Sequence, residues 1–203
     1  IVLYPDSPSP FVVLGLNITG GKEVQVWNLL TQKKAGQLQD AVQSGNPVSL
    51  SADGRYLAVK SRDSSRPTTL EIWSFQGGKM EREIECDDPK LRLGLFDFLG
   101  SDRLVTYTSG FWNKGVRHCL RFWDPASGNR LHEREISDSL REGLTAVSPG
   151  GRYFATMAGS DELAVYDSSN GELAGAVDVK SLLHASPGVF HGMSFSPDGR
   201  QLA

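Results

Sequence analysis

Apolar and polar residues alternate in short runs along the chain, and four of these runs end in the same way. The runs lie at 24–27, 70–73, 120–123 and 163–166, and they read apolar, polar, apolar, aromatic, with Ala164 at the second position of the last run. Alternation with period two is typical of β-strands, and no segment sustains the 3.6-residue period of an amphipathic helix. We therefore expect an all-β chain in which four aromatic residues are equivalent and largely buried between sheets: Trp27, Trp73, Trp123 and Tyr166.

A turn pattern recurs along the chain in step with these runs. An arginine follows Gly or Asp and precedes an apolar stretch at Arg55, Arg103, Arg152 and Arg200, at intervals of roughly 48 residues. Each period holds four short extended stretches separated by turn residues. In the second period these stretches are 48–51, 56–60, 70–75 and 79–85. Four strands in a period of this length are typical of one blade of a β-propeller.

The predicted fold is an all-β, partial β-propeller of about four four-stranded antiparallel blades plus the start of a fifth. The blades are expected at 1–45, 46–90, 91–140 and 141–185, and the next begins within 186–203. Each twisted sheet has two partly apolar faces, and stacking against neighbouring sheets buries both. Because the last repeat stops after its first turn, we expect the remaining blades to come from a longer parent chain or from another copy.

The motifs that mark these repeats resemble those of the WD-repeat family. They are the turn FSPDGR at 195–200, its relatives at 52–55 and 149–152, and the third-strand endings Trp123-Asp124 and Tyr166-Asp167. The resemblance implies a circular propeller that serves as an interaction platform. The chain resembles divergent bacterial members, because Asn28 and Ser74 stand where the family has Asp and no clear Gly-His pair opens a period.

Charge narrows the range of partners. The 21 basic and 24 acidic side chains give a formal net charge of −3, so the chain lacks the positive field that nucleic acid or an anionic membrane would require. No apolar stretch approaches the roughly 20 residues needed to span a bilayer, and no signal peptide is recognisable. We expect a soluble chain with neither nucleic acid nor membrane as partner; its localisation stays open, with the cytoplasm favoured.

The sequence offers no catalytic motif. Nucleophile-elbow, zinc-protease, P-loop and dinucleotide patterns are missing, and the four histidines are dispersed. Cys86 and Cys119 are expected to be buried or half-buried thiols, and the acidic pair Asp87-Asp88 to be solvated in a loop. These features predict a non-catalytic chain without cofactor or metal. Two alternatives stay open: a lactonase-like or lyase-like enzyme with its active site in the central funnel, and a purely structural spacer.

Loop lengths indicate which face of the propeller binds a partner. The loops between second and third strands and those between blades should emerge on one face, and here they are long: 61–68, 87–91, 109–117 and 181–188. Functional residues concentrate on long loops held by a rigid scaffold. We therefore expect a protein or peptide partner to bind this face.

One of these loops has an unusual composition. Residues 110–115 read GFWNKG and place Phe111 and Trp112 beside Lys114. Aromatic residues are frequent anchors of protein interfaces, so these three residues are the predicted partner-binding site, with Arg62 and Arg66 of the neighbouring loop as a polar rim. Two alternatives stay open: the aromatic rings tuck under a neighbouring blade, and the arginines are merely solvated.

Overall fold

The computed structural model describes residues 11–18, 21–39, 48–88, 90–112, 115–137, 139–159, 161–179 and 192–203. For residues 12–18, 21, 22, 112 and 141–144 it describes the backbone alone. Within the described residues the chain forms fifteen strands, and its one helical segment is a 3-10 turn at Pro149–Gly151. The predicted all-β fold is confirmed.

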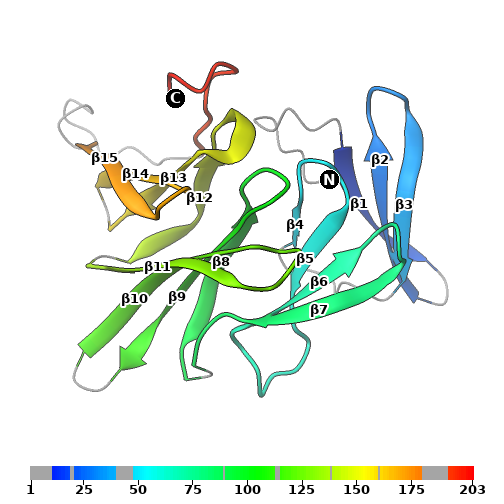
Figure 1. Cartoon of the computed structure of the whole chain (residues 1–203), viewed down its shortest axis with the longest axis horizontal. Coiled ribbons are helices and arrows are strands. Elements are labelled where there is room, and N and C mark those ends of the chain that lie inside the picture. The colour runs from blue at the N-terminus through cyan, green and yellow to red at the C-terminus, as the bar shows by residue number, and fades with distance from the viewer. Residues whose placement is uncertain are drawn as a thin grey trace.

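The strands form four antiparallel sheets that follow one another along the chain (Figure 1). In the described residues the first sheet has three strands, β1 (Phe11–Ile18), β2 (Gly21–Asn28) and β3 (Lys33–Gln39). The second sheet contains β4 (Val48–Leu50), β5 (Tyr56–Lys60), β6 (Thr69–Ser74) and β7 (Lys79–Glu85). The third contains β8 (Arg92–Phe98), β9 (Leu104–Trp112), β10 (Gly115–Trp123) and β11 (Arg130–Ile136). The fourth contains β12 (Leu140–Val147), β13 (Tyr153–Ala158), β14 (Glu162–Asp167) and β15 (Glu172–Asp178).

The sheets are arranged like the blades of a partial β-propeller. Each pairs its strands in chain order, and Figure 1 shows the four sheets fanned around an arc from blue to orange. The first strands meet on the inner side, where β8 contacts both β4 and β12. The strands predicted for the second period agree with β4 to β7 to within one residue at each end.

Apolar clusters fill the spaces between consecutive sheets. The first and second sheets share Val24, Val26 and Leu38 with Leu50, Leu57 and Val59. The second and third share Leu70, Ile72 and Ile84 with Leu93, Phe98 and Leu104, and the third and fourth share Val105, Leu120 and Phe122 with Leu140, Phe154 and Ala164. Phe195 and Leu202 form a β-bridge that packs on the far side of the fourth sheet. The second, third and fourth sheets therefore bury apolar side chains on both faces, as radial stacking requires.

The four repeated aromatic residues occupy equivalent positions. In every sheet the register between the last two strands shifts directly before the aromatic residue. Trp123 and Tyr166 are buried, whereas Trp27 and Trp73 are half-buried. Trp73, Trp123 and Tyr166 each pack into the cluster shared with the preceding sheet. Trp27 would face a side on which no described sheet lies, so the predicted burial is only partial for the first repeat.

The recurrent turn before each arginine has a structural cause. Ser51 Oγ donates to Asp53 Oδ1 at 2.7 Å and accepts the Tyr56 N–H at 2.9 Å, and residues 196–201 repeat the same bonds. Gly151 has a φ of 73°, and a Cβ there would lie 2.5 Å from the backbone carbonyl carbon of Leu99 in the preceding sheet. The motif thus sets a tight turn that packs against the neighbouring blade.

The residue after each aromatic also has a turn-forming role. Side-chain oxygens of four residues accept backbone N–H groups of the following turn: Asn28, Ser74, Asp124 and Asp167. Asn and Ser can therefore replace Asp here without loss of the local hydrogen bond. The first two repeats thus differ from the last two in residue type but share their local structure.

Candidate functional site

The predicted loop at 109–117 is instead a continuation of two strands. β9 extends to Trp112 and β10 begins at Gly115, so Phe111 pairs with Val116 and Trp112 with Gly115. The loop prediction was wrong because backbone groups in this segment find partners across the hairpin, and that pairing favours strands whatever the glycine content. Asn113, Lys114 and the side chain of Trp112 lie outside the described residues.

The tip of this hairpin presents an exposed apolar pair. Phe111 is 85% exposed and Val116, its direct cross-strand neighbour, is 53% exposed. Residues directly opposite in an antiparallel ladder carry their side chains on the same face. Phe111 therefore does not tuck under a neighbouring blade, and the two side chains together form a protruding apolar surface.

The same face of the hairpin is firmly packed closer to the sheet. Tyr107 is buried against the fourth sheet, and its hydroxyl accepts the Leu140 N–H at 3.2 Å and bonds to His118 Nδ1 at 2.7 Å. The Tyr107 and His118 rings stack with their centroids 6.1 Å apart. These contacts fix the hairpin relative to β12 just below the exposed tip.

The opposite face of the hairpin is held by a buried ionic cluster. The Arg121 side chain is 3% exposed, and its Nη1 donates to Asp87 Oδ2 in the connection between β7 and β8. Thr108 donates to the same Asp87 oxygen at 2.7 Å, and Arg121 Nε donates to Glu133 Oε2 at 2.9 Å. Arg117 lies 3.6 Å from Asp87 Oδ1. We call Asp87, Thr108, Arg117, Arg121 and Glu133 the Asp87 cluster.

Sequence reasoning assigned Asp87 a solvated role, and this was wrong. Its side chain is only 7% exposed, because the turn after β7 directs it towards the guanidinium of Arg121. Burial alone would raise the pKa of Asp87, but hydrogen bonds from Thr108 and the charge of Arg121 hold it below its ordinary value. The carboxylate therefore stays ionised and joins the second sheet to the third.

Two thiols flank this cluster. Cys86 and Cys119 are both free and buried, as predicted. Burial raises the pKa of Cys86 to about 12 and that of Cys119 to about 11. Thiolates are the reactive form of cysteine, so neither residue is suited to nucleophilic chemistry. Among the residues that the structure describes, no three His, Cys, Asp or Glu side chains are grouped to hold a metal ion.

The arginines of the predicted polar rim lie in the connection between β5 and β6. Arg66 forms ion pairs with Glu83 at 2.6 Å and Glu85 at 3.1 Å on β7. Arg62 is exposed, and it too interacts with other groups of the chain. The structure thus ties Arg66 to its own sheet, and exposed pairs of this kind contribute little to stability.

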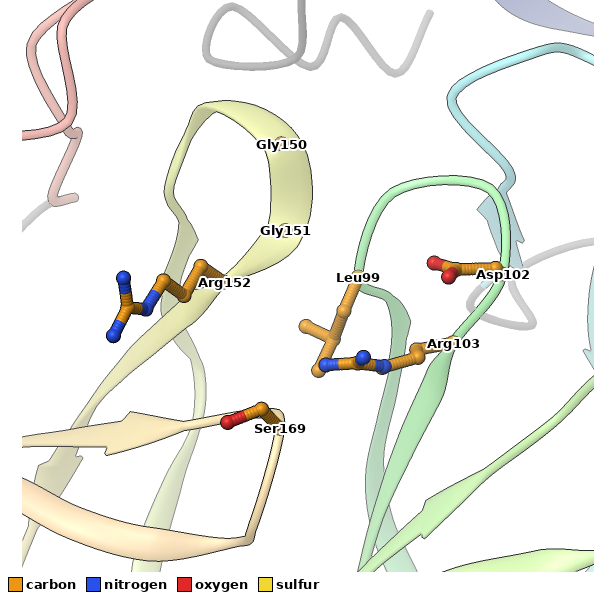
Figure 2. A pocket seen from close by; sticks show the side chains of 7 residues that line it. All are labelled: Leu99, Asp102, Arg103, Gly150, Gly151, Arg152 and Ser169. Atoms are coloured by element: carbon orange, nitrogen blue, oxygen red, sulfur yellow. The ribbon is translucent and has the colours of Figure 1, made fainter.

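A pocket of about 320 Å³ opens on the face opposite the tip of the β9–β10 hairpin, between turns of the third and fourth sheets (Figure 2). Its lining consists of Leu99, Asp102, Arg103, Gly150, Gly151, Arg152 and Ser169. Figure 2 shows the Arg103 side chain directed from the third sheet towards the fourth. Arg103 Nη1 donates to Ser168 Oγ at 3.0 Å, and that hydroxyl donates to the Gly151 carbonyl at 2.7 Å. Ligand pockets are mostly apolar, whereas the lining of this pocket is polar. Its hydrogen bonds connect the third sheet to the fourth.

Sequence reasoning missed the role of Arg103, although a signal was present. Arg55 and Arg152 lie over the tyrosine that follows each of them, with the guanidinium carbon 5.5 and 5.1 Å from the ring centroid. Arg103 is followed by Leu104 and so lacks such a ring. Without this local partner, its side chain bonds to the neighbouring blade instead.

The chain matches no protein-family model, and no curated protein matches it significantly. The described residues include no helix long and apolar enough to cross a membrane.

Proposed function

We propose that this chain is a non-catalytic protein-interaction module that binds a protein or peptide partner through the face carrying the β9–β10 hairpin. The exposed Phe111–Val116 pair is the observation that carries the proposal. An exposed aromatic on a well-held element loses little freedom on binding, and rigid aromatic anchors supply much of the free energy of protein interfaces.

The support beneath the pair strengthens this proposal. Tyr107 fixes one face of the hairpin to the fourth sheet, and Arg121 fixes the other to the connection from the second sheet. The tip therefore projects from a base held on both sides. Because the hairpin is already held in place, it loses little conformational entropy when a partner binds.

We also propose that the chain is a divergent relative of WD-repeat propellers. The FSPDGR turn at 195–200, the aromatic-Asp endings of β10 and β14 and the four-stranded sheets support this relationship. Members of that family act as interaction platforms, which agrees with a binding role for the hairpin.

The test begins with a photo-crosslinking amino acid at position 111, used in cells of the source organism to capture and identify the partner. Affinity for the purified partner is then measured with the wild type, Phe111→Ala and the double variant Phe111→Ala/Trp112→Ala. We expect each variant to lose about 2 kcal/mol or more of binding free energy.

Leu30 provides the matched control, because it is 82% exposed in the turn between β2 and β3, on the opposite face. Leu30→Ala should bind the partner as the wild type does. Equal affinity of the wild type and both hairpin variants would refute the proposed site.

A further inference from the structure

The turn between β12 and β13 lacks a carboxylate that two of its counterparts contain. Residues 51–55 read SADGR and residues 196–200 read SPDGR, whereas residues 148–152 read SPGGR. Asp53 and Asp198 each accept the serine hydroxyl of their own turn, at 2.7 and 2.6 Å, and the backbone N–H of the arginine, at 3.0 Å. Gly150 stands at the equivalent position and has no side chain to accept either group.

The space beside Gly150 is open. The turn keeps the hydrogen bond from the Gly151 N–H to the Ser148 carbonyl, at 2.8 Å, that its two counterparts also form. A Cβ built at Gly150 would meet no heavy atom within 4 Å, and Gly150 lines the pocket of about 320 Å³ between the third and fourth sheets (Figure 2). The turn therefore leaves room for a group from another molecule.

An arginine without a carboxylate partner extends into the same pocket. Arg103 is half-buried, and Figure 2 shows its side chain crossing from the third sheet towards the fourth. Among the described residues it forms no ion pair, and its one hydrogen bond goes to the neutral Ser168 hydroxyl at 3.0 Å. Arg55 and Arg152, by contrast, each pair with an aspartate of their own sheet. A guanidinium carries five N–H donors, so Arg103 retains donors for a further group.

Two other charged residues line the pocket. Arg152 is exposed, and its Nε lies 3.4 Å from Asp167 Oδ2, so its charge is partly balanced within the fourth sheet. Asp102 is exposed as well, and its negative charge opposes the binding of an anion. Within the described part of the chain, Arg103 is thus the lining cation whose charge has no carboxylate partner, and it is the group best suited to hold an anion.

We propose that this pocket binds a carboxylate group, with Arg103 as its main donor. A carboxylate is favoured over other anions because Asp53 and Asp198 supply one at the equivalent position of their turns. The planar guanidinium of an arginine can also bond to a carboxylate through two parallel N–H groups. The carboxylate can belong to a small organic acid or to an acidic side chain of a peptide. The pocket lies on the face opposite the Phe111–Val116 pair, so the two proposals can fail independently.

The first probe is succinate, a small dicarboxylate, added to the chain while its backbone amides are followed by two-dimensional NMR. We expect saturable shifts concentrated at residues 99–103, 150–152 and 168–169. Succinamide, which has the same carbon skeleton without charge, should cause none. Shifts centred elsewhere, or equal binding of succinamide or of inorganic phosphate, would overturn the proposal.

The second probe places the carboxylate on a peptide. It is a pentapeptide with a central aspartate among alanines and both ends capped, and the same peptide with asparagine is its control. Tighter binding of the aspartate peptide than of succinate assigns the site to acidic peptides, and the reverse order assigns it to small organic acids. No saturable binding of either probe would overturn the proposal.

Paired arginine variants test the assigned donor. Arg103→Gln removes the charge but keeps an amide that can donate to Ser168, and it should weaken binding of the tighter probe at least about tenfold. Arg55→Gln makes the same change at the corresponding turn of the second sheet and should leave binding unchanged. Equal binding by Arg103→Gln and the wild type would refute the role of Arg103.

Variants that retain Arg103 complete the test. Gly150→Asp converts residues 148–152 into SPDGR, the sequence of the turn at 196–200, and supplies the carboxylate from the chain itself. It should weaken binding of the tighter probe at least about tenfold, whereas Gly150→Asn occupies the same space without a charge and should weaken it less. Asp102→Asn removes the opposing charge and should tighten binding. Unchanged or tighter binding by Gly150→Asp, or weaker binding by Asp102→Asn, would contradict a carboxylate site.

Discussion

The two ends of the β9–β10 hairpin are built from the same pair of strands but have opposite environments. Near the sheet, the side chains of 104–108 and 119–123 are buried between neighbouring blades. At the tip, Phe111 and Val116 are exposed. The strand pairing is continuous between them, from Leu104 with Trp123 to Trp112 with Gly115.

This difference divides one element into a packed base and an exposed apolar tip, and the tip is the surface that we propose for recognition. The base contributes to stability through apolar packing and the Asp87 cluster. The tip adds backbone hydrogen bonds, but its apolar side chains bury little area. Substitutions at the base should therefore reduce stability, whereas substitutions at the tip should affect binding alone.

The largest effect is expected at the base. Phe122 is fully buried between the third and fourth sheets, so Phe122→Ala should lower the free energy of unfolding by roughly 4 kcal/mol. Urea denaturation followed by tryptophan fluorescence measures this change. Phe122→Leu, which retains most of the apolar volume, should cost clearly less; equal costs would mean that packing at the base does not limit stability.

The ionic support of the base is tested next. Arg121→Met leaves the Asp87 carboxylate buried without its main cation and should lower the free energy of unfolding by about 3 kcal/mol. The double variant Asp87→Asn/Arg121→Met removes both charges and should recover part of the loss in the same denaturation assay. A double variant less stable than Arg121→Met would show that the unpaired Asp87 carboxylate does not cause the loss of stability in Arg121→Met.

A third prediction concerns Asp97, which pairs with Val105 at the base of the hairpin. Burial raises the pKa of Asp97 to about 6, although hydrogen bonds from Ser49 Oγ, at 2.5 Å, and the Phe98 N–H oppose the shift. The folded chain thus retains this proton up to about pH 6, while the unfolded chain loses it near its ordinary pKa of 3.8. The resulting stabilisation is complete below pH 3.8 and is lost as the pH rises through 6.

The Asn variant isolates this contribution. Asp97→Asn resembles the protonated side chain and cannot titrate, so its stability relative to the wild type should increase by on the order of 2 kcal/mol between pH 4 and pH 7. Parallel urea titrations of both proteins across this range measure the difference. A constant difference would contradict the raised pKa.

Much of the scaffold could be predicted from sequence because its signals are local. Strand alternation and turn glycines located β4 to β7 to within one residue, and the aromatic register identified the repeats. The link between Asp87 and Arg121 joins residues 34 positions apart, and nothing in either local sequence indicates it.

The candidate site was only partly predictable. The residue types at 110–115 drew attention to Phe111, but its glycines and polar residues suggested a loop rather than paired strands. Only pairing across the hairpin, which depends on register over the whole of β9 and β10, shows that Phe111 and Val116 form one surface. Val116 was missed for this reason.

The smallest effect is expected at the tip, and it is the sharpest test of the comparison. Phe111→Ala removes a side chain that is 85% exposed and leaves its backbone pairing with Val116 intact. Surface substitutions away from caps, cores and networks usually change stability by less than about 0.5 kcal/mol. We therefore expect the denaturation midpoint of Phe111→Ala to match that of the wild type. A loss above about 1 kcal/mol would mean that the ring packs against the protein in solution, and the division of the hairpin into scaffold and recognition surface would then be wrong.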